Sequence, residues 1–202
     1  KTLDVKVYEH NPNRQGSLPD GTVMNVFVDK DDELWVSSGG AGILRFDRKS
    51  EKFFKVVATE SSFGGASSAT KDSSNRLWVA GFGTGVQLIE EDTRNLANFR
   101  HSTSDPTSLS NSSVNQPYVD RQGNVWLPTA DGVSLLQRWR KPFVRYSHNT
   151  ENPNSMVSGD TWSVIEDTRG RIWISTYEGG VSRFDPRTQE FRNYTVRDHF
   201  HG

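Results

Sequence analysis

The sequence predicts an all-β protein made of β-propeller blades. Short runs rich in Val, Ile, Phe, Tyr and Trp alternate with polar positions, and no stretch keeps a helical i, i+3, i+4 apolar pattern over three turns. A tryptophan-anchored unit recurs four times, and a glycine follows each anchor at a similar distance. Short strands in repeated units of 43 to 48 residues are typical of propellers.

Composition narrows the possible functions. The 202 residues, 33% of them hydrophobic, are enough to bury a core. The 24 Lys and Arg residues nearly balance the 25 Asp and Glu residues, which argues against nucleic acid as a partner. The absence of cysteine excludes a disulfide framework and a cysteine nucleophile. No apolar run reaches the roughly 18 residues of a membrane helix, so no membrane segment is predicted in this chain.

The four units share one internal order: an apolar run, a polar turn, a Trp-led run, a glycine-rich bend and two further runs. This order predicts four antiparallel strands per blade. The anchors lie 43, 48 and 47 residues apart and are Trp35, Trp78, Trp126 and Trp173. The blades are expected at about 20–58, 64–100, 112–147 and 159–196, within one propeller fragment spanning 1–202.

Each blade needs its neighbours. A single four-stranded meander has two apolar faces, so the units must stack, and the four tryptophans are expected to be buried at equivalent positions between blades. A tight bend before each third strand requires positive φ, which suits a glycine. The residues at these bends are Gly42, Gly85, Gly132 and Gly180.

Two features predict irregularity. Pro117 and Pro128 fall inside expected strands of the third unit, where each would delete a ladder donor, so that blade should depart from the others. Residues 1–10 match the last strand of a preceding blade, and the fourth unit ends on a last strand of its own. The ring is therefore expected to be incomplete, with open apolar faces that further blades or a second copy of the chain would cover.

The histidines do not predict a metal site. His10, His101 and His148 recur at one place in the repeat, but equivalent positions on successive blades lie at least about 10 Å apart. Imidazole ligands must come to about 2 Å from one ion, so a turn role is favoured. His199 and His201 could hold an adventitious ion, but a terminal tail is the simpler interpretation.

Other chemical motifs are equally weak. The acidic cluster Asp29, Asp31, Asp32 and Glu33 resembles the start of a calcium loop but lacks the required glycine and distal glutamate. The stretch AGFGTG precedes no helix, so it is interpreted as a bend and not as a phosphate loop. No Gly-x-Ser-x-Gly elbow occurs. No catalytic residue, metal or cofactor is predicted.

Two segments carry a family resemblance. EDTRGRIWISTYEGGVSRFDP and VDKDDELWVSSGGAGILRFD resemble the two-component regulator propeller repeat, with its Trp-led core, glycine pair and Arg-Phe-Asp. The second unit has Leu88-Ile89-Glu90 in place of Arg-Phe-Asp, and the third has lost that motif and the glycine pair. The resemblance implies a periplasmic sensor region of an inner-membrane protein whose output domain is a histidine kinase or a diguanylate cyclase.

Three functions remain open: a ligand-sensing propeller, a propeller enzyme of the lyase type and a protein-docking scaffold. The sequence favours sensing, because its polar variation lies in loops and shows no concentrated acid, base and nucleophile. The family analogy suggests a small molecule or an oligosaccharide as the ligand.

A binding rim is predicted where the linkers between blades meet the bends between second and third strands. The linkers are 10–22, 101–113 and 148–161, and the bends are 39–42, 82–85, 130–132 and 177–180. The candidate ligand-binding residues are Phe82, Asp131, Asp160, Trp162, Tyr177 and Glu178. The alternative is that Trp162 and Tyr177 pack on a neighbouring blade and that the acids are solvated.

Overall fold

The computed structural model describes residues 5–57, 66–90, 95–137 and 140–195. They form four antiparallel sheets of four strands, each ordered as in the sequence. The first two sheets contain β1 (Val23–Val28), β2 (Leu34–Ser38), β3 (Gly42–Asp47) and β4 (Lys52–Val57), then β5 (Ala66–Lys71), β6 (Leu77–Gly81), β7 (Gly85–Ile89) and β8 (Asn95–Phe99). The last two contain β9 (Tyr118–Val119), β10 (Val125–Thr129), β11 (Gly132–Gln137) and β12 (Arg140–Tyr146), then β13 (Thr161–Glu166), β14 (Ile172–Thr176), β15 (Val181–Asp185) and β16 (Glu190–Tyr194).

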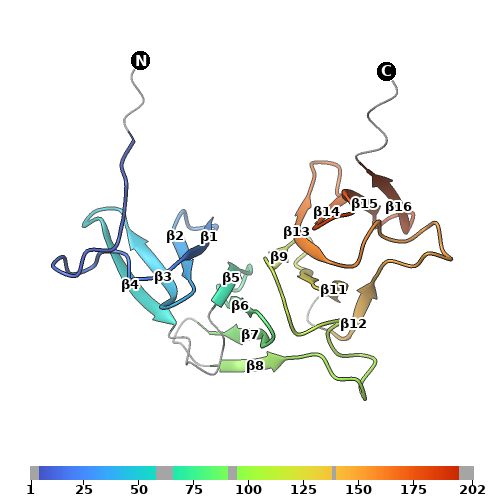
Figure 1. The fold of residues 1–202 in the computed structure, drawn as a ribbon, viewed down its shortest axis with the longest axis horizontal. Helices are drawn as coiled ribbons and strands as arrows, with labels where there is room; N and C mark the ends of the chain where they lie inside the picture. Colours follow the sequence, from blue (N-terminus) through green and yellow to red (C-terminus); the bar gives the residue numbers. More distant parts are fainter. Residues whose placement is uncertain (1–4, 58–65, 91–94, 138–139, 196–202) are drawn as a thin grey trace.

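The four sheets follow one another around a central space and leave the ring open between the first and the last (Figure 1). The first strand of each blade lies on the inside, because β1 contacts β5, and β9 contacts both β5 and β13. The prediction of an all-β, incomplete ring of propeller blades is confirmed. The described residues contain no helix long and apolar enough to cross a membrane.

The core lies between blades, as the stacking argument predicts. Trp35 clusters with Leu77 and Val79 of the second blade, Trp78 with the third blade and Trp126 with the fourth. These three tryptophans are buried. The expectation is wrong for Trp173, which is only half-buried, because no sheet follows the fourth blade in the described residues.

Each anchor tryptophan is fixed by an aspartate six residues earlier, in the turn between first and second strands. The indole Nε1–H donates to this carboxylate over 2.8 to 3.1 Å, in the pairs Trp35–Asp29, Trp78–Asp72, Trp126–Asp120 and Trp173–Asp167. The other carboxylate oxygen accepts backbone N–H groups two and four residues further on. One side chain therefore shapes the turn and orients the anchor.

The four bend glycines have positive φ, between 81° and 110°. At Gly132 a Cβ atom would lie 2.2 Å from the carbonyl oxygen of Tyr146 on the last strand. The bend therefore requires glycine for its backbone conformation and also for the close approach of a neighbouring strand.

The third blade departs from the others. Its first strand, β9, has two residues and follows Pro117 directly. Pro128 lies within β10 opposite Val133, and its carbonyl accepts the N–H of Asn115 in the incoming linker over 2.9 Å. The linker thus bonds to β10 where a longer β9 would continue, as expected for a strand that contains proline.

The N-terminal segment lies against the first blade. Residues 5–9 form no strand, and Tyr8 packs edge-on against Phe46 and Phe53, with ring centroids 5.0 and 5.8 Å apart. Residues 1–4 lie outside the described residues. The assignment of 1–10 to a preceding blade stays a prediction.

Candidate functional site at the channel mouth

Hydrogen bonds join the linkers to the bends on one rim of the blades. Gly39 donates to the carbonyl of Thr22, Val114 to that of Gly81, Gly132 to that of Gly159 and Tyr177 to that of Asp160. Two of these bonds, Val114 to Gly81 and Gly132 to Gly159, connect one blade to the linker that enters the next. The rim is therefore joined by hydrogen bonds across the second, third and fourth blades.

The three repeated histidines hold the linkers in shape. The Nδ1 atoms of His10, His101 and His148 lie 2.9, 2.8 and 2.7 Å from carbonyl oxygens eight residues further on. A carbonyl can only accept, so Nδ1 carries the proton in each ring. Their predicted turn role is confirmed. His199 and His201 lie outside the described residues.

The acidic cluster at the first hairpin is a turn of the repeated kind. Asp29 accepts the backbone N–H groups of Asp31 and Glu33 and the indole N–H of Trp35. Its Oδ2 atom also lies 3.1 Å from the Lys71 ammonium of the second blade. Burial alone would raise the pKa of Asp29, but these donors outweigh it and hold that pKa below its ordinary value.

A cavity of about 230 Å³ lies at the mouth of the central channel. Its lining residues come from the inner strands β1, β5 and β13, the bend after β6 and the linker into the third blade: Met24, Asn25, Ser67, Ser68, Phe82, Asn115, Gln116, Trp162 and Ser163. We call this cavity the mouth cavity. It brings together two of the predicted site residues, Phe82 and Trp162.

The inner strands share a bulge that places side chains in this cavity. The pairing register shifts between Val23 and Asn25 in β1, between Ala66 and Ser68 in β5, and between Thr161 and Ser163 in β13. The extra residues are Met24, Ser67 and Trp162, and all three line the mouth cavity. Bulges redirect side chains and recur next to binding sites.

The two rim aromatics of the fourth blade stack on each other. The rings of Trp162 and Tyr177 are 6.0 Å apart with an interplanar angle of 22°. Trp162 is 50% exposed and Tyr177 65%, while Phe82 of the second blade is 45% exposed. A stacked, exposed pair beside a cavity is a suitable platform for a flat ligand face.

The predicted acids surround the aromatics without lining the mouth cavity. Asp131, Asp160 and Glu178 are all exposed on the rim. Two unpredicted residues inside the cavity are more informative. The side-chain oxygens of Asn25 and Ser68 are buried and have no hydrogen-bond partner among the described residues. Buried polar groups are normally paired, so these oxygens favour a ligand that can hydrogen-bond to them.

One segment of the chain matches the sequence model of a known family. Residues 155–178 match the sequence model of the family described as "Two component regulator propeller". The resemblance of the fourth unit to the two-component regulator propeller repeat is therefore confirmed, over its linker and first two strands. A search of curated proteins found no match.

Solved structures share the fold. The extracellular domain of the hybrid two component system BT3049 from B. thetaiotaomicron superposes with a TM-score of 0.70 at 23% identity, covering 94% of this chain and 24% of that one. A streptogramin B lyase gives a TM-score of 0.66 at 14% identity and covers 89% and 56%. PorZ, a surface component of the type-IX secretion system of Porphyromonas gingivalis, gives 0.63 at 18% identity and covers 96% and 30%. This chain thus spans about a quarter of the BT3049 chain and just over half of the lyase, and at these identities the likeness shows the fold alone.

Proposed function

We propose that this chain is an extracytoplasmic ligand-sensing propeller of a bacterial signal-transduction receptor, and that its ligand docks at the mouth cavity. The observation that carries the proposal is the repeated bulge of the inner strands. A bulge at one position in three blades places Met24, Ser67 and Trp162 around one cavity. Stacking of the blades alone does not require it, and bulges of this kind recur next to binding sites, where they redirect side chains.

The ligand class follows from the lining. Amide and hydroxyl side chains surround the mouth cavity, two buried oxygens lack partners among the described residues, and Phe82, Trp162 and the adjoining Tyr177 offer aromatic faces. Sugar rings present hydroxyls at their edges and C–H groups on their faces, which match these two kinds of surface. We therefore assign an oligosaccharide as the ligand.

The family repeat also supports a proposal for the parent protein. The propeller would lie in the periplasm as part of an inner-membrane receptor, with further blades completing the ring. A histidine kinase or diguanylate cyclase in the cytoplasm would receive the signal. On this proposal the chain itself catalyses no reaction.

A glycan array probed with the labelled propeller tests the proposal. The wild-type chain should bind at least one oligosaccharide, and the double variant Trp162→Ala, Tyr177→Ala should lose that binding while it keeps its Tm. Phe54→Ala is the matched control, because Phe54 is a similarly exposed aromatic (47%) on the outer strand β4. Equal binding by the double variant would contradict the assignment.

The similarity to streptogramin B lyase keeps an enzymatic alternative testable. Quinupristin is present in the solved structure of a virginiamycin B lyase that shares this fold. Incubation of the chain with quinupristin, followed by liquid chromatography, should show no conversion. Conversion that is lost when the rim residues are changed would replace the sensing proposal with a lyase.

A further inference from the structure

A second and larger cavity lies between the third and fourth blades, at the end of the blades opposite the mouth cavity. It has a volume of about 390 Å³. Its walls come from the turn before β10, the turn before β14 and the turn after β15, whereas the rim lies at the other ends of these strands. We call it the turn cavity. The buried side chains of Trp126, Ile172 and Phe184 contribute to its lining.

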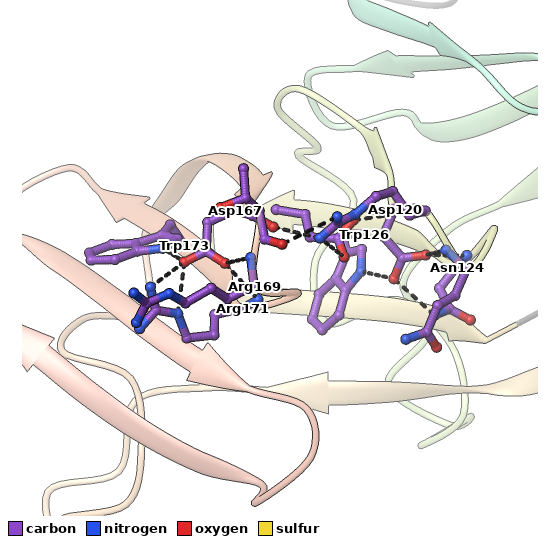
Figure 2. A network of polar contacts seen from close by, with 11 residues as sticks. Asp120, Asn124, Trp126, Asp167, Arg169, Arg171 and Trp173 are labelled. Atoms are coloured by element: carbon purple, nitrogen blue, oxygen red, sulfur yellow. Dashed lines mark hydrogen bonds and ion pairs between the residues drawn. The ribbon is translucent and has the colours of Figure 1, made fainter.

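The turn aspartate of the third blade differs from its three counterparts in charge compensation. Asp29 lies 3.1 Å from the ammonium of Lys71, Asp72 lies 3.1 Å from the guanidinium of Arg76, and Asp167 lies 2.7 Å from that of Arg171. Asp120 instead accepts a neutral amide N–H from Asn124 over 2.8 Å. Figure 2 shows this contrast, with Arg171 beside Asp167 and Asn124 beside Asp120. Asp120 is 8% exposed and lines the turn cavity.

At the interface between the first and second blades, a lysine occupies the place beside the turn aspartate and the anchor tryptophan. Between the first and second blades, Lys71 at the end of β5 inserts its ammonium between Asp29 and the ring of Trp35, 4.4 Å from the ring centroid. Its side chain is only 6% exposed. Glu166 holds the same position at the end of β13, and it pairs with Arg121 over 3.0 Å. The fourth blade therefore supplies an acid where the second supplies a base.

We propose that the turn cavity binds a small organic cation with one primary ammonium group on a short apolar stem. The ammonium takes the place at Asp120 and Trp126 that Lys71 takes at Asp29 and Trp35. It displaces the side-chain amide of Asn124 from Oδ2 and gains a charge-assisted hydrogen bond and a cation–π contact. The stem packs on the apolar lining. This inference does not depend on the proposed sensing function.

The remaining charges of the lining select the kind of cation. Arg169 and Arg187 line the turn cavity and are exposed. Their repulsion grows with the charge of the ligand, so it disfavours a multivalent cation more than a cation with a single charge. The carboxylate of Glu166 is paired with Arg121, and that of Asp185 accepts the backbone N–H of Arg187 over 2.9 Å. Within the described part of the chain, Asp120 is thus the buried acid of this lining without a paired cation.

The test uses n-butylammonium as the probe, because it reproduces the end of a lysine side chain, and butanoate as the matched anion. Titration followed by NMR should shift the indole N–H signal of Trp126 and the side-chain amide of Asn124 with n-butylammonium and not with butanoate. No shift with n-butylammonium, or equal shifts with both probes, would overturn the proposal.

A variant that copies the turn of the other blades sharpens the test. Asn124→Arg gives Asp120 the i+4 cation that Asp72 and Asp167 have, so it should raise Tm and weaken n-butylammonium binding by about tenfold or more. Asn124→Gln, which stays neutral, should bind the probe within about threefold of wild type. Unchanged binding by Asn124→Arg would overturn the site, while binding of a glycan at the mouth cavity should be unaffected by either variant.

Discussion

At the scale of single residues, an aspartate and a tryptophan six positions apart define each blade. The sequence places aspartate at the start of each hairpin turn and tryptophan in the next strand, and both positions are predictable from the repeat. The hydrogen bond between the indole and the carboxylate is not predictable from the repeat, because it depends on the conformation of the turn. In the third blade, four backbone and side-chain N–H groups converge on the carboxylate of Asp120.

The turn aspartate of the fourth blade, Asp167, makes stability depend on pH. The pKa of Asp167 is lowered, and the largest cause is the hydrogen bond from the indole N–H of Trp173. Arg171 and two backbone N–H groups lower this pKa further, and burial, which raises it, is outweighed. The folded state therefore binds this proton more weakly than the unfolded state. The stabilisation is complete above the ordinary aspartate pKa of about 4 and is lost as the pH falls through the lower folded-state pKa.

Asp167→Asn tests this dependence. The variant should be less stable than wild type at pH 7, and the difference should shrink as the pH falls from about 4 to about 2. Urea unfolding at several pH values measures both free energies of unfolding. A difference that is constant over this range would contradict the assignment of the titration to Asp167.

Glycine at the bends gives a second prediction at this scale. Gly132→Ala combines a positive φ of 82° with a Cβ atom 2.2 Å from the carbonyl oxygen of Tyr146. Gly123→Ala is the matched control, because Gly123 has a φ of 80° and no heavy atom of the described residues within 4 Å of its Cβ position. Gly123→Ala should cost about 1 to 2 kcal/mol of unfolding free energy, and Gly132→Ala should cost clearly more or prevent folding. Equal Tm values for the two variants would rule out the close approach.

At the scale of strands and blades, the sequence predicts the unit but not its distortions. Alternating apolar positions predict the strands, and Pro117 and Pro128 predict the irregular third blade. The bulges in β1, β5 and β13 are not visible in the sequence, because one extra residue leaves the strand composition unchanged. The bulges determine which side chains reach the mouth cavity, so Asn25 and Ser68 could not be predicted to line it. The rim aromatics Phe82 and Trp162 could be predicted, because no β-ladder requires them at their positions.

The stacking of blades predicts unequal roles for equivalent tryptophans. Trp78 is fully buried between the second and third blades, whereas Trp173 is half-buried and stacks on Tyr194, with ring centroids 5.5 Å apart. Trp78→Ala should cost about 3 to 5 kcal/mol, and Trp173→Ala about half of that or less. Urea unfolding monitored by circular dichroism measures both variants. Equal losses would indicate that Trp173 is covered in solution, as it would be by a further blade or a second copy of the chain.

At the scale of the whole molecule, the repeat period and the family motifs predict an incomplete propeller. The mouth cavity could be predicted only in part, because it forms where three inner strands, one bend and one linker converge. Phe82 and Trp162 stood out as aromatics that no ladder requires. The turn cavity could not be predicted from any single unit, because its walls come from two blades. The missing cation at Asp120 is recognised only when the four turn aspartates are compared.

The most direct measurement of the central claim is the output of the proposed full-length receptor in response to an oligosaccharide that the wild-type propeller binds on the glycan array. Output should be abolished in the variant Trp162→Ala, Tyr177→Ala, Glu178→Ala, since these residues form the platform and rim beside the mouth cavity, while the propeller keeps its Tm. The outer-strand control Phe54→Ala should respond as wild type does. A triple variant that stays folded and still responds fully would contradict the claim that the propeller senses its ligand at the channel mouth.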